Sequence, residues 1–111
     1  MRKRVLLVVG ASSGIGLRVA QKAADAGHAV YGGSRRDCPD ERVTSLTLDA
    51  NKPNTLSESI QRIVRETGRI EQLVYSAGFS MAAPVEYAKE EDYRYLFEVN
   101  FFGALECVRL V

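Results

Sequence analysis

The 111-residue chain contains no tryptophan, one histidine and two cysteines, and the scarcity of histidine and cysteine argues against a zinc site. His28 has no second imidazole with which to complete a zinc site, and Cys38 and Cys107 show no CxxC or metal-ligand spacing. His28 lies between Gly27 and an apolar run, which predicts a turn residue rather than a catalytic base. Two isolated cysteines indicate a reducing, cytoplasmic compartment.

An excess of charge and long apolar runs are also missing. Fifteen basic residues oppose fourteen acidic ones, and the net charge of +1 is not gathered on a tail or face as nucleic-acid binding requires. No run approaches the roughly 20 apolar residues of a membrane span, and the first run stops at a glycine, unlike a signal peptide. We therefore expect no nucleic-acid partner and no membrane. With 46% hydrophobic residues, residues 1–111 have the composition of one folded domain.

What the chain does contain is an alternation of short apolar runs and helical patterns. The apolar runs predict four strands, at residues 5–9, 29–34, 43–48 and 70–75. The helical patterns predict helices at residues 15–26, from Pro53 to a stop at Gly68, and from about residue 89 onward. Only a loop or a single turn fits between the second and third strands. This order predicts an α/β fold with parallel strands joined by right-handed crossovers.

The stretch GASSGIG at residues 10–16 ends the first strand and opens the first helix. Such a turn points backbone N–H groups and the positive end of the helix dipole into the crevice, where a pyrophosphate fits. Gly10 permits the tight turn, Gly14 lets the backbone approach the phosphates, and Gly16 lets the helix pack close to the strand. Ser12 and Ser13 add hydroxyl donors. Because the spacing is not the general GxGxxG, a glycine-rich turn without a ligand stays open at this point.

Three further motifs follow in order: LDA at 48–50, SAG at 76–78 and FEVNFFGAL at 97–105. Together with GASSGIG they resemble the short-chain dehydrogenase/reductase family over the whole chain. The resemblance implies a Rossmann-type doubly wound parallel sheet, of which residues 1–111 hold the first four strands only, the N-terminal cofactor-binding half. It also implies three groups of cofactor-binding residues: a phosphate loop with Gly10, Ser12, Gly14, Ile15 and Gly16; an adenine-contacting pair, Asp49 and Ala50; and the end of a strand motif NNAG, Ala77 and Gly78.

Asn100 matches the family's catalytic asparagine, which holds a water at the end of a proton relay. Its helical neighbours also draw attention to it, because it shares a face that we expect to be buried with Leu96, Phe97, Gly103, Ala104 and Cys107. An amide on a buried face needs partners. The pattern alone also suits a structural asparagine bonded to local backbone, and the resemblance favours the catalytic role.

The chain departs from the family pattern at two neighbouring strand ends. Val9 stands where the family has a threonine, and Tyr75 and Ser76 stand where it has the two asparagines of NNAG. We expect packing to replace the polar link between the first and fourth strands, with Ser76 keeping one hydroxyl. The departure concerns local geometry more than cofactor binding.

The second predicted strand ends in GGSRR, which bears on the choice of cofactor. NAD-specific members have an acidic residue there, which bonds the adenosine ribose and repels a 2′-phosphate. Ser34 removes that repulsion, and the guanidinium groups of Arg35 and Arg36 match phosphate oxygens. We predict NADP(H) over NAD(H), with Arg35 as the main contact and Arg36 as the secondary one. Two solvated loop arginines are the alternative.

The family's hydride transfer between a nicotinamide and a carbonyl or alcohol uses a serine and a YxxxK motif. None of the five tyrosines here is followed four places later by a lysine. The resemblance therefore implies an NADP(H)-dependent oxidoreductase of small-molecule carbonyls or alcohols, with the serine and YxxxK beyond Val111 and this chain alone inactive. A non-catalytic NADP(H)-binding or regulatory module, complete at 111 residues, is the alternative, and a structural protein that has lost its ligand is a third.

Two surfaces of the predicted fold have no packing partner within residues 1–111. The fourth strand would have an unpaired edge, and the last helix is apolar and ends without a cap. Both predict a tendency to associate, and a homo-oligomer is a family expectation. The stretch FSMAAPVEY at residues 79–87 is expected to border the substrate pocket.

Overall fold

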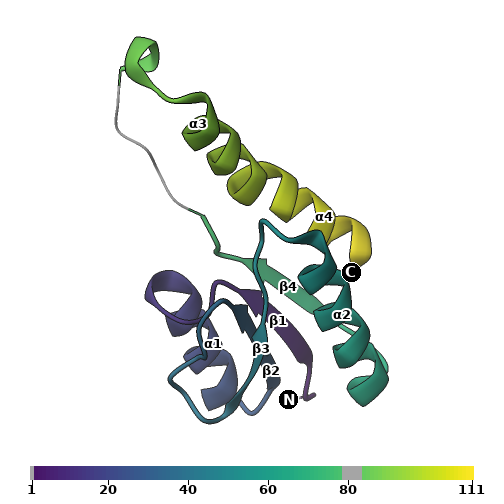
Figure 1. The fold of residues 1–111 in the computed structure, drawn as a ribbon. Helices are drawn as coiled ribbons and strands as arrows, with labels where there is room; N and C mark the ends of the chain where they lie inside the picture. Colours follow the sequence, from purple (N-terminus) through teal and green to yellow (C-terminus); the bar gives the residue numbers. More distant parts are fainter. Residues whose placement is uncertain (1, 79–83) are drawn as a thin grey trace.

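The computed structural model describes residues 2–78 and 84–111, so residues 79–83 of the expected substrate-pocket stretch lie outside the description. The described chain alternates strands and helices, and α3, η2 and α4 follow one another without a break (Figure 1). The elements are β1 Val5–Val9, α1 Gly14–Asp25, β2 Ala29–Ser34, β3 Val43–Thr47, α2 Pro53–Thr67, β4 Gln72–Tyr75, the 3-10 turn η1 Val85–Tyr87, α3 Glu90–Phe97, the π-helical turn η2 Glu98–Phe102 and α4 Gly103–Leu110.

The four strands form one parallel sheet in the order β3-β2-β1-β4. β1 lies in the interior of the sheet and is buried throughout, which explains its uninterrupted apolar sequence. It pairs with β2 from Val5 opposite Ala29, and with β4 from Leu6 opposite Gln72. β4 is an edge strand among the described residues, as expected.

Helices cover both faces of this sheet, with α1 on one side and α2 with α4 on the other (Figure 1). Alternate residues of β1 serve the two faces, because successive side chains of a strand point in opposite directions. Leu7 packs in a core with α2 and α4, whereas Val8 packs in a second core with α1. The predicted Rossmann-type doubly wound sheet of four parallel strands is confirmed.

The predicted element bounds agree closely with the structure. β1 and β2 have the predicted ends, and α2 begins at Pro53 and stops at Gly68, whose φ of +83° closes the helix. β3 ends one residue early, at Thr47, and β4 begins two residues late, at Gln72. The segment between β2 and β3 contains no helix.

One expectation about the last helix is wrong. Asn100 is exposed and Phe97 is 55% exposed, whereas Val99, Gly103 and Cys107 form the buried face. The cause is the π-helical turn η2, in which the Gly103 amide bonds the carbonyl five residues back, at Glu98. The extra residue per turn rotates Asn100 away from the face that α4 presents to the sheet.

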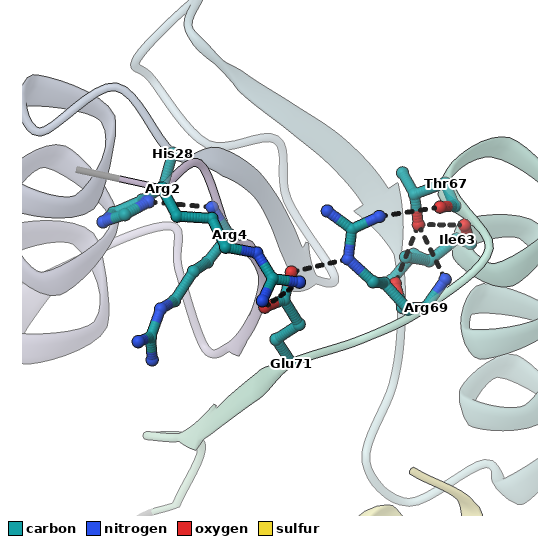
Figure 2. Close-up of polar contacts among 7 residues, drawn as sticks. All are labelled: Arg2, Arg4, His28, Ile63, Thr67, Arg69 and Glu71. Atoms are coloured by element: carbon teal, nitrogen blue, oxygen red, sulfur yellow. Dashed lines mark hydrogen bonds and ion pairs between the residues drawn. The ribbon is translucent and has the colours of Figure 1, made fainter.

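At the amino ends of the strands, polar contacts join the segments that precede β1, β2 and β4 (Figure 2). The Arg4 amide donates to His28 Nδ1 at 3.0 Å, and the Arg69 guanidinium bonds Glu71 at 2.6 Å. His28 directly follows the turn that ends α1, as the sequence predicts. Its place at this edge separates it from the opposite edge, where the strands end.

Candidate functional site

A cleft of about 650 Å³ lies at the carboxyl ends of the strands. Ligands of open parallel sheets bind in the crevice at this edge. The cleft is lined by every residue predicted to bind the cofactor except Gly16: Gly10, Ser12, Ser13, Gly14, Ile15, Ser34, Arg35, Arg36, Asp49, Ala50, Ala77 and Gly78. The structure thus brings together residues from four separate segments of the chain.

The floor of the cleft is the glycine loop, residues 10–16. Gly10 has a φ of +90°, and a Cβ there would lie 2.7 Å from the amide nitrogen of Ala77. A Cβ on Gly16 would lie 2.0 Å from the Gly10 carbonyl oxygen, so this buried glycine lets α1 start directly against the loop. Gly14 has a φ of +59°, and no neighbouring element among the described residues lies within 4 Å of the position that a Cβ would take. Its backbone is therefore open to the cleft.

The amino end of α1 lines the same floor. Ser13 occupies the N-cap position, but no side chain in the described parts of the chain caps the helix, and the first turn holds no acidic residue. The first intrahelical bond is made by the Leu17 amide to the Ser13 carbonyl, so the amides of Gly14, Ile15 and Gly16 have no intrahelical acceptor. These N–H groups and the helix dipole suit an anion.

The wall beyond β2 carries two cations. The Ser34 hydroxyl donates to the Arg36 carbonyl and so ties the turn that holds Arg35 and Arg36. Both arginines are exposed at the cleft, and neither forms an ion pair with another described residue. Since no acid neutralises them, they raise the positive potential over this end of the cleft.

The neighbouring segment of the cleft, after β3, is fixed by local hydrogen bonds. The Asp49 amide donates to the Thr55 hydroxyl at 2.9 Å, and the Asn51 amide donates to Asp49 Oδ1 at 2.9 Å. Asp49 and Ala50 are both half-buried and line the cleft. The carboxylate is thereby held in one place rather than free in solvent.

Asn100 lies at the margin of the cleft and not in its lining. Its Oδ1 is 2.7 Å from the position that a Cβ on Gly78 would take, so the absence of a side chain at Gly78 makes room for the amide. Val99, the residue before it, does line the cleft. The structure therefore places the predicted asparagine beside the predicted SAG motif.

Sequence reasoning missed the contribution of η2 and α3 to the site. Tyr95 and Val99 line the cleft, and their four-residue spacing on a helix is the signal that could have paired them. It also missed a polar contact of Tyr75, whose hydroxyl donates to the Val99 carbonyl. Burial raises the pKa of Tyr75 to about 12. Between β1 and β4 themselves, Val9 is fully buried opposite Tyr75, in line with the expected packing.

The residues present fit a dinucleotide. The cleft offers open backbone and uncapped amides for a pyrophosphate, a fixed carboxylate, and two unneutralised guanidinium groups. In residues 2–78 and 84–111, no three His, Cys, Asp or Glu side chains gather as a metal site. No helix in those residues is both long enough and apolar enough to cross a membrane.

Comparison with known proteins agrees with this geometry. A family model described as short chain dehydrogenase matches residues 4–111. A 3-ketodihydrosphingosine reductase of Bacteroides thetaiotaomicron is 33% identical over 100% of this chain and 42% of its own length. The ligand-free structure of Thermoplasma acidophilum aldohexose dehydrogenase matches with a TM-score of 0.94 and 30% identity, over 98% of this chain and 43% of that one.

A structure of ElxO with NADP bound matches with a TM-score of 0.88 and 25% identity, over 98% of this chain and 49% of that one. The chain thus spans less than half the length of each of these three proteins.

Proposed function

This chain belongs to the short-chain dehydrogenase family, and from that premise we propose that it is the N-terminal cofactor-binding half of an NADP(H)-dependent oxidoreductase. The observation that carries the proposal is one cleft that joins the uncapped amino end of α1 to two arginines, which form no ion pair with another described residue. The protein would act in the cytoplasm on a small-molecule carbonyl or alcohol. When bound, NADP(H) supplies or accepts the hydride.

Each part of the cleft has a separate task in this proposal. The glycine loop and the first amides of α1 hold the pyrophosphate, with the Ser12 and Ser13 hydroxyls as further donors. Asp49 and Ala50 contact the adenine, and Ala77 and Gly78 border the cofactor at the end of β4. Asn100, beside Gly78, holds a water of the proton relay.

Arg35 and Arg36 decide the choice of cofactor. A charge-assisted hydrogen bond from a guanidinium to the 2′-phosphate contributes about 1.5 to 3 kcal/mol, roughly a tenfold to hundredfold preference for NADP(H). Ser34 supports this preference because it bears no charge and its hydroxyl is engaged by the Arg36 carbonyl. The NADP-bound relative supports the same choice.

The names of the relatives support the substrate class. One relative is a reductase of a keto compound and another a dehydrogenase of an aldohexose, so both are named for carbonyl or alcohol chemistry. The 111 residues contain no YxxxK, and the proposed reaction depends on a serine, tyrosine and lysine placed after Val111. The same cleft would also serve the second candidate, a non-catalytic NADP(H)-binding module.

Calorimetric titration of the full-length protein with NADPH and with NADH tests the proposal. We expect NADPH to bind at least about tenfold more tightly, and Arg35→Ala to bring the two affinities within roughly twofold. Arg36→Ala should have a smaller effect. Arg4→Ala is the matched control, because it removes the same charge at the opposite edge of the sheet, where Arg4 forms no side-chain ion pair with a described residue (Figure 2).

Two results would contradict parts of this account. An unchanged ratio of affinities in Arg35→Ala would overturn the assignment of that arginine. A silent titration of folded protein with both nucleotides would leave only a structural role. Turnover separates the two remaining candidates, because a module without catalysis would bind NADPH and leave ketones, keto esters and aldehydes unreduced.

A further inference from the structure

The π-helical turn η2 leaves a buried carbonyl without its usual helical donor. In a regular α-helix the amide of Gly103 would bond the carbonyl of Val99, four residues earlier. Here that amide bonds the carbonyl of Glu98 instead. Val99 is only 7% exposed, and an unpaired buried carbonyl is costly. The Gly103 amide is therefore not the donor to the Val99 carbonyl.

Tyr75 at the end of β4 supplies a donor instead. Its hydroxyl donates to the Val99 carbonyl, across 24 residues of sequence. Gly103 makes room for the phenol, because a Cβ there would lie 2.5 Å from the Tyr75 hydroxyl. The phenol is protonated, and therefore a donor, at neutral pH, and burial raises its pKa further, to about 12.

The segment that follows β4 contacts η2 at a second point. Gly78, three residues after Tyr75, lies under the amide of Asn100, one residue after Val99. Residues 75–78 therefore contact η2 twice. Tyr75 donates a hydrogen bond to the Val99 carbonyl, and the Asn100 side chain packs closely against Gly78. A change in the helical register of η2 would break both contacts together.

We propose that Tyr75 is a positioning residue: its hydrogen bond to the Val99 carbonyl holds η2 in the π-helical form and so fixes the Asn100 amide beside Gly78. The ring of Tyr75 also packs against the core shared with α2 and α4. Phenylalanine would keep that packing and lose only the hydroxyl. The conformational part of the proposal stands on these contacts, and its catalytic consequence rests on the proposed function.

Nuclear magnetic resonance of the full-length protein tests the conformational part. In Tyr75→Phe we expect the carbonyl-carbon shift of Val99 and the side-chain amide shifts of Asn100 to move together. Tyr31→Phe is the matched control, because the Tyr31 hydroxyl also bonds across to a helix, at 2.6 Å from Glu66, but away from the cleft. It should move neither signal. Unchanged Asn100 signals in Tyr75→Phe would overturn the proposal.

A double-mutant cycle tests the catalytic consequence. With NADPH and a set of ketones, keto esters and aldehydes, Tyr75→Phe should lower kcat about tenfold or more and change the Kd for NADPH by less than about twofold. In an Asn100→Ala background the same change should lower kcat no further. Additive effects would mean that Tyr75 does not act through Asn100. If the wild-type protein binds NADPH but reduces no carbonyl, the proposed function fails, and the resonance shifts still decide the role of Tyr75.

Discussion

Single residues of the glycine loop meet different physical requirements. At Gly16 the requirement is space, since a side chain would collide with the Gly10 carbonyl. At Gly10 it is both space and a φ of +90°. Gly14 needs only its φ of +59°, because no neighbouring element in residues 2–78 and 84–111 lies within 4 Å of a Cβ there. Gly14 is therefore the position at which stability and nucleotide binding can be separated.

Gly14→Ala should weaken NADPH binding as well as the fold, whereas a matched change away from the cleft should weaken the fold alone. An alanine in the left-handed region costs roughly 1 to 2 kcal/mol of unfolding free energy. Gly68→Ala is the control, because Gly68 has a φ of +83°, equally empty surroundings and a place at the end of α2. Urea unfolding should show similar losses in both variants, whereas calorimetry should show at least a tenfold loss of NADPH affinity in Gly14→Ala alone. Equal affinities in the two variants would remove Gly14 from the phosphate site.

At the scale of elements, the strands and the cleft can be predicted from the sequence, whereas the geometry of the last helix cannot. Continuous apolar runs and glycine stops predict β1, β2 and α2, because these features are local. The ends of parallel strands meet at one edge, so the predicted cofactor-binding residues come together in one cleft once the strand order is known.

The π-helical turn could not be predicted in this way. The stretch FEVNFFGAL suits an α-helix as well as a π turn, and the choice depends on the hydroxyl of Tyr75, which is 24 residues away in the sequence. The predicted face of Asn100 was wrong for that reason. A tyrosine in place of the family's asparagine was visible in the sequence, but its partner is a backbone carbonyl, which no residue pattern identifies.

The hydrogen bond from Tyr31 of β2 to Glu66 of α2 predicts that stability depends on pH. Burial, followed by the hydrogen bond to Glu66, raises the pKa of Tyr31 to about 12 from the usual value near 10. The folded protein then holds its proton more tightly than the unfolded chain. The contribution to stability is complete below about pH 10 and is lost as the pH rises through about 12.

Tyr31→Phe should remove that dependence. Near pH 8 the variant should lose about 1 kcal/mol of unfolding free energy, the typical net value of one hydrogen bond. Between about pH 10 and 12 its stability should fall less steeply than that of the wild type, as urea unfolding would measure. Tyr87→Phe, at a side chain that is 76% exposed, should keep the wild-type slope. A wild-type slope in Tyr31→Phe would show that this phenol titrates normally.

At the scale of the whole molecule, the described chain departs from a sphere. Its extents are 51 × 24 × 21 Å, because the continuous helix of α3, η2 and α4 projects beyond the sheet (Figure 1). An apolar stripe follows this helix at spacings of four, four and three residues: Phe97, Phe101, Leu105 and Val108, each more than half exposed. One edge of β4 pairs with no other described strand, and it adds backbone donors and acceptors.

Exposed apolar surface of this kind predicts that the 111-residue polypeptide associates with further copies of itself. Sedimentation velocity should show a mass that rises with concentration above 12.3 kDa. The double substitution Phe101→Lys and Leu105→Lys should shift the polypeptide toward the monomer, since each lysine places a charge in the middle of the stripe. Lysines at Val64 and Val85, which are 44% and 92% exposed on other elements, change the net charge equally and should leave the association intact. If both pairs of lysines disperse the polypeptide to the same extent, net charge and not the helix stripe governs its association.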